Sequence, residues 1–305
     1  MTIASLLIAN RGEIAIRIAG AAAELGIRTV AVYAEDDARS LHTRRADKAV
    51  ALRATGVKAY LDIERLVTIA HAEGCDAIHP GYGFLSENAN FARACGDAGL
   101  TFVGAPPDLL ELYGNKVAAR ELARRCGVLV PKATGPCPTL DQARDFLASL
   151  GPAGGVMVKA VRGGGGRGIR RAFDQAELVT AYERCRSEAR AAFGDDDVYV
   201  EEVVPDARHI EVQVIGDRAG ALAQLGEREC SIQRRHQKIM EIAPSPSLSA
   251  VTRDAIVAAA LTMAGEGGCI GLGTFEFLVP DAATERFLYM ETNPRLQVEH
   301  TVTEE

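Results

Sequence analysis

Short apolar runs alternate with segments of helical periodicity along the N-terminal third of the chain. The apolar runs, each expected to form a strand, are residues 5–9, 28–33, 77–79 and 101–103. Apolar side chains recur at helical spacing between them, in residues 10–25, 59–73 and 87–98. Strands that alternate with helices predict a parallel α/β sheet, whose ligands gather at the carboxyl ends of the strands. We therefore expect an N-terminal α/β domain over residues 1–107.

The pattern changes after this domain. Residues 108–130 carry two short helical patterns and are predicted to form a helical linker. The next unit, residues 131–203, should contain a glycine-rich loop after its first strand. We expect helices at residues 140–150 and 175–192, and strands at residues 155–159 and 198–201. The last unit, residues 204–305, has strand patterns at residues 208–215, 221–227, 273–279 and 287–291, and a helical one at 249–266. Hairpin-like spacing predicts a mainly antiparallel sheet there.

The composition is that of a soluble globular protein of about two domains. Of the 305 residues, 48% are hydrophobic and 25% are charged, and no apolar run is long enough to cross a membrane. The formal net charge of −7 argues against binding nucleic acid through overall charge. Trp is absent and aromatic residues make up only 5%, which disfavours stacking on single-stranded nucleic acid. We expect neither nucleic acid nor a membrane as partner.

The cysteines indicate a reducing compartment. There are seven, an odd number, and no two have Cys-x-x-Cys spacing. The apolar run at residues 3–9 is short and follows no basic leader, so we interpret it as a core strand and not as a signal peptide. The expectation is a cytoplasmic protein with reduced thiols.

Residues 291–300 concentrate more chemically useful side chains than any other segment. The odd positions are Glu291, Asn293, Arg295, Gln297 and Glu299. An extended chain sends alternate side chains to opposite faces, so these groups would line one side. Pro294 favours that geometry, because it restricts its own φ and the residue before it. We predict a reaction site here, with an ordinary polar edge strand as the alternative.

Two acidic residues lie inside apolar strand patterns. Glu276 and Glu291 belong to runs that could be antiparallel neighbours. Buried carboxylates that face each other repel unless a cation bridges them. Hard oxygen ligands suit Mg²⁺ or Mn²⁺, and Asn293 would add a third ligand. The alternative is that the two carboxylates form separate salt bridges.

Two polar loops are candidates for binding anions. In residues 159–168, four consecutive glycines follow a strand that ends in Lys159, and their backbone N–H groups can approach a phosphate closely. This loop has neither a Walker A motif nor a dinucleotide fingerprint, and a flexible hairpin is the alternative. Residues 230–238 pack three cations and a histidine into what we expect to be a short loop. A surface charge run is the alternative there.

Six segments together resemble the biotin carboxylase family, a branch of the ATP-grasp superfamily. They are residues 8–15, 79–88, 163–168, 229–238, 273–277 and 291–300. The resemblance implies a pre-ATP-grasp, Rossmann-like N-terminal domain, then an ATP-grasp lid with a glycine-rich flap. It also implies a mainly antiparallel C-terminal domain that normally continues past residue 305. We expect a chain ending there to bind nucleotide weakly and to carboxylate free biotin poorly or not at all.

The resemblance also implies where ATP and metal bind. The positions that match the family's nucleotide-binding residues are Lys116, Lys159, Gly164, Gly165, Gly166, Glu201, Val204, His209, Gln233, His236, Glu276, Leu278 and Glu291. Of these, Glu201 and Val204 would meet the adenine mostly through their backbone. Glu276, Glu291 and Asn293 match the ligands of two Mg²⁺ or Mn²⁺ ions.

For bicarbonate, the resemblance implies a second set of residues. They are Lys238, Arg295, Gln297, Val298 and Glu299. Glu299 would be the general base, with Lys238 and Arg295 as further catalytic residues, so that bicarbonate attacks the γ-phosphate of ATP and forms carboxyphosphate. N1 of biotin would then take the CO₂, and Tyr82 and Arg295 would meet the biotin.

The implied partners are a biotin carboxyl carrier domain and a carboxyltransferase domain or subunit, with a homodimer as a further possibility. Acetyl-CoA, propionyl-CoA, longer acyl-CoA, pyruvate and urea all stay open as final acceptors. One alternative is another ATP-grasp ligase, of carbamoyl-phosphate synthase type, which is not expected to carry residues 234–238 and 297–300 as they stand here. The other is a non-catalytic assembly fragment.

Overall fold

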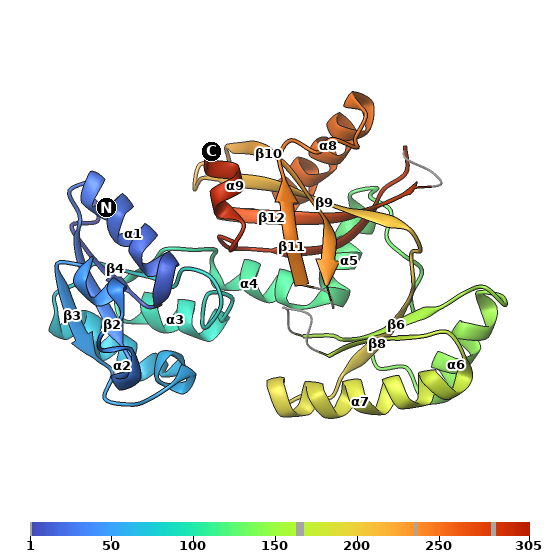
Figure 1. The fold of residues 1–305 in the computed structure, drawn as a ribbon, viewed down its shortest axis with the longest axis horizontal. Helices are drawn as coiled ribbons and strands as arrows, with labels where there is room; N and C mark the ends of the chain where they lie inside the picture. Colours follow the sequence, from blue (N-terminus) through green and yellow to red (C-terminus); the bar gives the residue numbers. More distant parts are fainter. Residues whose placement is uncertain (1, 163–167, 235–236, 282–284) are drawn as a thin grey trace.

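A computed structural model describes residues 2–162, 168–234, 237–281 and 285–305. It confirms the α/β class, since a parallel sheet comes first and two antiparallel sheets follow (Figure 1). The parallel sheet and its helices form one end of the molecule, and helices α4 (Pro107–Gly114) and α5 (Lys116–Arg125) lead from it to the other two sheets. The domain boundaries at residues 107, 130 and 203 remain predictions.

The N-terminal sheet has the strand order β3-β2-β1-β4-β5. Its strands are β1 (Ser5–Ile8), β2 (Arg28–Tyr33), β3 (Lys48–Ala51), β4 (Ala77–His79) and β5 (Thr101–Phe102). Strand β1 is buried on both faces: Leu6 and Ile8 pack with helix α1 (Gly12–Glu24), and Leu7 packs with helices α2 (Ile63–Ala72) and α3 (Ala89–Asp97). Helices on both faces explain why its sequence is a continuous apolar run.

Two details of this region were predicted wrongly. Strand β3 was missed, because all of its residues stay at least partly exposed and leave no buried run in the sequence. The helix expected at residues 59–73 is divided into a 3₁₀ helix (Val57–Leu61) and α2. The division lies at Asp62, whose side chain caps α2 by accepting a hydrogen bond from the backbone N–H of Arg65.

Asn10 fixes the loop that follows β4. Its side-chain amide donates to the carbonyls of Pro80 at 2.6 Å and Tyr82 at 2.8 Å. Gly81 between them has φ +64°, and a Cβ there would lie 2.9 Å from the Asn10 amide nitrogen, so the loop requires glycine. These contacts hold Tyr82 beyond the carboxyl end of the sheet, where a site was expected.

The second sheet is antiparallel, with the strand order β7-β6-β8. It comprises β6 (Val156–Ala160), β7 (Ile169–Ala172) and β8 (Val198–Glu202), covered by helices α6 (Leu140–Ser149) and α7 (Gln175–Phe193). The sequence pattern missed β7, because two arginines interrupt its apolar alternation. The predicted nucleotide-binding positions Gly164, Gly165 and Gly166 lie outside the described residues.

The third sheet is antiparallel throughout, as predicted, with the strand order β11-β10-β9-β12-β13. Its strands are β9 (Ala207–Gly216), β10 (Leu222–Arg234), β11 (Gln237–Ile242), β12 (Gly271–Pro280) and β13 (Leu288–Asn293). Helix α8 (Ala250–Glu266) packs on the sheet, and the short helix α9 (His300–Glu304) ends the chain. Helices α4 and α5, predicted as a linker, share this core through Tyr113 and Leu122.

The interpretation of residues 230–238 as a short loop was wrong. Strand β10 continues to Arg234, β11 begins at Gln237, and Ile232 pairs with Met240. β11 is an edge strand, and all of its side chains stay at least partly exposed. Charged residues are tolerated at such positions, and here they interrupt the apolar pattern that would have predicted a strand. Among the described residues, no helix has the combination of length and apolar character needed to cross a bilayer.

Candidate active site

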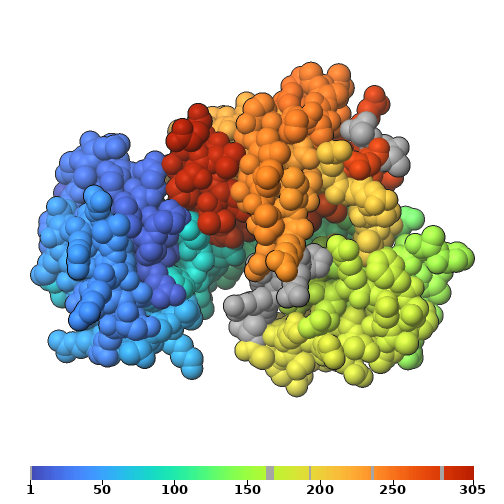
Figure 2. Space-filling model, in the orientation of Figure 1, coloured from blue at the N-terminus to red at the C-terminus, as the bar shows by residue number. Residues whose placement is uncertain are grey.

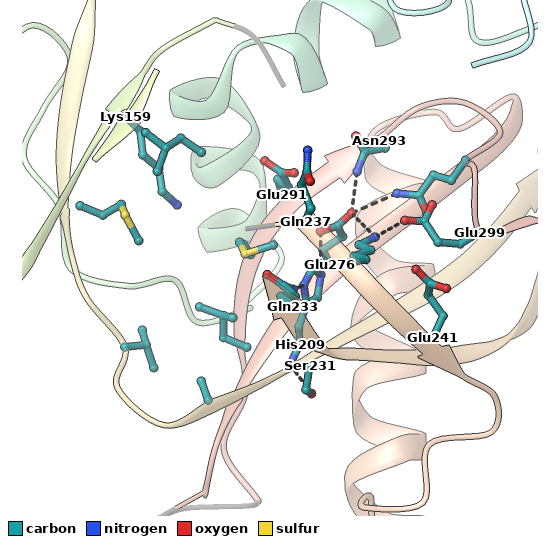
Figure 3. Close-up of a pocket in the computed structure, with 18 of the residues that line it drawn as sticks. Lys159, His209, Ser231, Gln233, Gln237, Glu241, Glu276, Glu291, Asn293 and Glu299 are labelled. Carbon is teal, nitrogen blue, oxygen red and sulfur yellow. Dashed lines mark hydrogen bonds and ion pairs between the residues drawn. The ribbon is translucent and has the colours of Figure 1, made fainter. Parts of the chain in front are cut away.

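One large cleft lies among the three sheets. Its volume is about 920 Å³, and its walls come from the loop after β4, from β6 to β8, and from the third sheet with the segment that follows it. Figure 2 shows the hollow between the N-terminal region, in blue, and the second sheet with its helices, in yellow-green. The close-up in Figure 3 shows Lys159 approaching from one wall, while Glu276, Glu291 and Asn293 lie on the other.

Most of the predicted site residues line this cleft. They are Tyr82, Lys159, Glu201, Val204, His209, Gln233, Lys238, Glu276, Leu278, Glu291, Asn293, Arg295, Gln297, Val298 and Glu299. Lys116 is not among the lining residues, but it begins α5 near enough to Glu291 for the two charges to interact. His236 lies outside the described residues.

Glu276 and Glu291 face each other across neighbouring strands, as predicted. They are direct partners in the pairing of β12 with β13. Burial, and then the charge of Glu276, raise the pKa of Glu291 above its ordinary value. Burial acts on Glu276 in the same direction, but the charges of His209 and Lys238 outweigh it and lower the pKa of that carboxyl. One carboxylate of the pair is thus stabilised by cations, and the other lacks enough positive charge nearby.

That imbalance fits a divalent metal ion. The predicted alternative of separate salt bridges describes Glu276, which lies 2.7 Å from His209 Nε2 and 3.6 Å from Lys238 Nζ. It does not explain the raised pKa of Glu291. A cation between the two carboxylates would offset their repulsion, and oxygen ligands of this kind suit Mg²⁺ or Mn²⁺. Asn293 donates its amide to Glu276 at 2.7 Å, which leaves its amide oxygen beside Arg295.

We predict that Glu291→Gln stabilises the ligand-free chain. Because folding raises the pKa of Glu291, the unfolded state loses this proton first as the pH rises. The destabilising contribution is therefore absent below the unfolded pKa, near pH 4, and grows as the pH rises toward the folded pKa. The amide cannot ionise, so the free energy of unfolding should be higher than that of the wild type at pH 7.5 and unchanged near pH 4. Urea unfolding at both pH values measures this.

The matched control for this variant is Glu266→Gln, at an exposed position near the end of α8. Addition of MgADP should raise the stability of the wild type and of this control, but much less that of Glu291→Gln. An equal gain in stability for both variants without ligand, or an equal response of both to MgADP, contradicts the proposed repulsion at Glu291.

Lys238 lies among three carboxylates. Its Nζ is 2.5 Å from Glu211, 3.1 Å from Glu299 and 3.6 Å from Glu276. Burial favours the neutral amine, but the charges of Glu276 and Glu211 outweigh burial and raise the pKa of Lys238 well above its usual range. The side chain therefore keeps its positive charge at any physiological pH.

Arg295 lies beside these groups with its guanidinium held in place. It donates to Glu87 at 2.6 Å, to the Asn293 amide oxygen at 3.1 Å and to the Leu296 carbonyl at 3.0 Å. Gln297 is 3% exposed and donates its amide to Glu276 at 3.0 Å. A small planar anion placed here would meet two cations and an amide within one wall of the cleft.

The expected extended geometry of residues 291–300 was wrong beyond Asn293. Strand β13 ends there, the backbone N–H of Arg295 bonds to the Asn293 carbonyl at 2.9 Å, and helix α9 begins at His300. The alternation of side chains along an extended strand therefore does not explain why the odd-numbered side chains meet. The turn brings them to the cleft instead, and Val298 also reaches it although 56% exposed.

Lys159 has the anionic partner that its burial required. It is 8% exposed and forms an ion pair with Glu201 of the neighbouring strand. Glu201 is buried as well and accepts from Arg120 at 2.8 Å. A phosphate in the cleft would compete with Glu201 for Lys159, and Arg120 would still neutralise the carboxylate if the lysine turned toward that phosphate.

Several residues of the cleft were missed. Gln237 and Glu241 line it from β11, a strand that was not predicted, and Arg171 lines it from β7 for the same reason. Glu211, fully buried beside Lys238, was not predicted as a site residue either. A charged residue inside an apolar strand pattern was the signal for Glu211, as it was for Glu276.

Two protein-family models match the chain. The model described as biotin carboxylase, N-terminal domain, matches residues 2–110. The model described as carbamoyl-phosphate synthase L chain, ATP binding domain, matches residues 115–305. Together they cover nearly the whole chain, with the biotin carboxylase model on the N-terminal sheet.

Known proteins are similar over the same range. Pyruvate carboxylase of Bacillus subtilis is 50% identical over 99% of this chain, and pyruvate carboxylase 1 of Caenorhabditis elegans is 48% identical over 98%. The chain spans only about a quarter of these relatives, 26% and 25% of their lengths.

Solved structures agree with these relatives. The biotin carboxylase domain of Hydrogenobacter thermophilus 2-oxoglutarate carboxylase, a dimer in complex with MgADP, ADP and bicarbonate, has a TM-score of 0.95 and 42% identity, covering 100% of this chain and 66% of that one. The Campylobacter jejuni biotin carboxylase–β,γ-ATP complex also has a TM-score of 0.95, with 40% identity over 99% of this chain and 68% of that one. The N-terminal match and these neighbours favour biotin carboxylase over the carbamoyl-phosphate synthase alternative. The chain belongs to the biotin carboxylase family of ATP-grasp ligases.

Proposed function

We propose that this chain is the biotin carboxylase part of a biotin-dependent carboxylase and carboxylates biotin with bicarbonate at the expense of MgATP. The observation that carries the proposal is a meeting of two kinds of group in one cleft. A facing carboxylate pair, Glu276 and Glu291, lies next to an anion-binding wall that also holds a buried carboxylate, Glu299. A phosphoryl donor with its metal and a small anionic acceptor would thus be adjacent.

In this proposal ATP spans the cleft. Its phosphates would be bound by Lys116, Lys159 and the glycines at positions 164–166, with Arg120 neutralising Glu201 when Lys159 turns away. The remaining nucleotide-binding positions are Glu201, Val204, His209, Gln233, His236 and Leu278. Glu276, Glu291 and Asn293 would hold two Mg²⁺ or Mn²⁺ ions, which supply charge neutralisation on the phosphate oxygens.

Bicarbonate would bind to Lys238, Arg295, Gln297 and the backbone near Val298. Since Arg295 is paired with Glu87, bicarbonate would have to compete for that guanidinium. Glu299 would take the proton of bicarbonate, and the freed oxygen would attack the γ-phosphorus of ATP. The bond from phosphorus to the β,γ-bridging oxygen breaks, so that carboxyphosphate and ADP form. Carboxyphosphate then breaks down to CO₂ and phosphate. N1 of biotin, near Tyr82 and Arg295, would lose its proton to that phosphate and form its new bond to the carbon of CO₂.

The proposed partners are a biotin carboxyl carrier domain and a carboxyltransferase, with a homodimer as the assembly. By their names, similar proteins act on pyruvate, on 2-oxoglutarate and on long-chain acyl-CoA, and one is a single-chain, multi-domain enzyme. These proteins are all similar to this chain but differ in the final acceptor of the carboxyl group. That difference is expected if the reaction of this chain ends with the carboxylation of biotin. We therefore propose that the final acceptor is chosen elsewhere.

Calorimetry with MgADP, followed by phosphate release from MgATP with and without bicarbonate, tests this function. We expect MgADP to bind and phosphate release to require bicarbonate. A chain that binds no nucleotide would be the assembly fragment of the alternative interpretation. Hydrolysis that is independent of bicarbonate would contradict the proposal and indicate a different ATP-grasp reaction.

A further inference from the structure

Arg228 is the most deeply buried cation of the third sheet, yet it does not line the cleft. Only 1% of its surface is exposed. Its guanidinium donates to Glu211 at 2.6 Å, Gln213 at 3.1 Å, Gln297 at 2.7 Å and Thr303 at 2.5 Å. A planar fork with fixed directions can serve that many acceptors, whereas an ammonium on a flexible stem cannot.

The contact with Glu211 bears on Lys238. Arg228 holds one carboxylate oxygen of Glu211, and Lys238 holds the other. Glu211 is thereby shared between two cations, so it neutralises less of the charge of Lys238. An anion that approaches Lys238 meets a more positive site than it would without Arg228.

The contact with Gln297 fixes the direction of a side-chain amide. A guanidinium only donates hydrogen bonds, so the oxygen of Gln297 must face Arg228. The amide nitrogen then points the other way, toward Glu276, to which it donates at 3.0 Å. The bond to Thr303 also ties the first turns after Glu299 to strand β10.

We infer that Arg228 is a positioning residue for the anion side of the cleft, which holds Gln297, Lys238 and the segment around Glu299 in their working arrangement. The inference rests on the proposed function, in which these groups bind bicarbonate. It adds a residue from outside the cleft to that site. Arg228 acts through other side chains and touches no substrate.

The test is Arg228→Lys, which keeps the positive charge but loses the fork. The KM for bicarbonate in phosphate release should rise about tenfold, the size of one lost charged hydrogen bond, while the KM for MgATP stays within about twofold. Arg253→Lys is the matched control, because Arg253 also holds a buried carboxylate, Glu227, but lies outside the cleft. It should leave both KM values near wild type. Equal rises in both KM values for Arg228→Lys, or no rise in either, overturn the inference.

A second variant covers the case in which Arg228→Lys does not fold. Arg228→Met combined with Glu211→Gln leaves no unpaired buried charge. Because it removes the donor that orients Gln297, it should still raise the KM for bicarbonate and leave the KM for MgATP within about twofold of wild type. Hydrogen exchange of the Gln297 side-chain amide, followed by NMR, gives a readout that needs no turnover. We expect about tenfold faster exchange in either variant, and unchanged exchange overturns the inference. A wild type without bicarbonate-dependent turnover would count against the proposed function only, since the amide exchange still decides the role of Arg228.

Discussion

Glu299→Gln is expected to reduce bicarbonate-dependent phosphate release from MgATP by about 10²- to 10⁴-fold, the range that general bases contribute. The carboxylate is 7% exposed and lies 3.1 Å from Lys238 Nζ, on the wall proposed for bicarbonate. Glutamine keeps the size of the side chain but cannot accept the proton. Because Glu299 makes no proposed contact with nucleotide, the affinity for MgADP should stay within about twofold of wild type. Initial rates and calorimetry on the same preparations measure both.

Glu304→Gln is the matched control, because this carboxylate lies in the same terminal segment and is held by Arg17 and His300 outside the cleft. It should turn over at nearly the wild-type rate. Normal bicarbonate-dependent turnover in Glu299→Gln would remove this residue from the role of base. A parallel loss of MgADP binding would instead mean that the substitution disturbs the whole cleft.

Lys238→Met should cost both activity and stability. Without the ammonium, Glu211, Glu276 and Glu299 would crowd one buried region, although Arg228 still neutralises Glu211 in part. Removing one member of a buried ion pair costs about 3–5 kcal/mol, so the free energy of unfolding should fall by an amount of this order. Bicarbonate-dependent turnover should be lost, because the charge that would bind the anion is gone. Urea unfolding and phosphate release are the measurements.

A double-mutant cycle separates this electrostatic effect from simple loss of packing. Glu299→Gln added to Lys238→Met should restore part of the stability, because one of the carboxylates that lost their ammonium partner is then neutral, while Glu211 stays paired with Arg228. Lys132→Met, at an exposed position, should change the free energy of unfolding by no more than about 0.5 kcal/mol. Additive losses in the double variant would contradict the charge balance inferred for Lys238.

The sequence was informative where burial and chemistry coincide. Glu276 stood out because an acid interrupted an apolar run, and the structure places it opposite Glu291 as predicted. The parallel order of the first sheet and the antiparallel third sheet also followed from the spacing of apolar runs. In each case the prediction rested on a buried strand, which the sequence shows as a local run of apolar residues.

The same pattern failed where strands stay exposed or where contacts depend on register. Strand β11 was missed because it is an edge strand, so Gln237 and Glu241 could not be assigned to the cleft. The network around Arg228 depends on its pairing with Glu211 across two strands and on a helix far along the chain. The periodicity of apolar residues does not predict such contacts, because they depend on how the strands and the helix are arranged in the folded protein.

Oxygen transfer from bicarbonate to phosphate tests the proposed reaction most directly. The chain would be incubated with MgATP and ¹⁸O-labelled bicarbonate, without carbonic anhydrase, and the released phosphate analysed by mass spectrometry. Attack of bicarbonate on the γ-phosphorus leaves a bicarbonate oxygen on phosphorus when carboxyphosphate breaks down, so the phosphate should carry one ¹⁸O atom. Phosphate that is released at the same rate but carries no ¹⁸O would mean that water is the nucleophile, and would contradict the role proposed for the cleft.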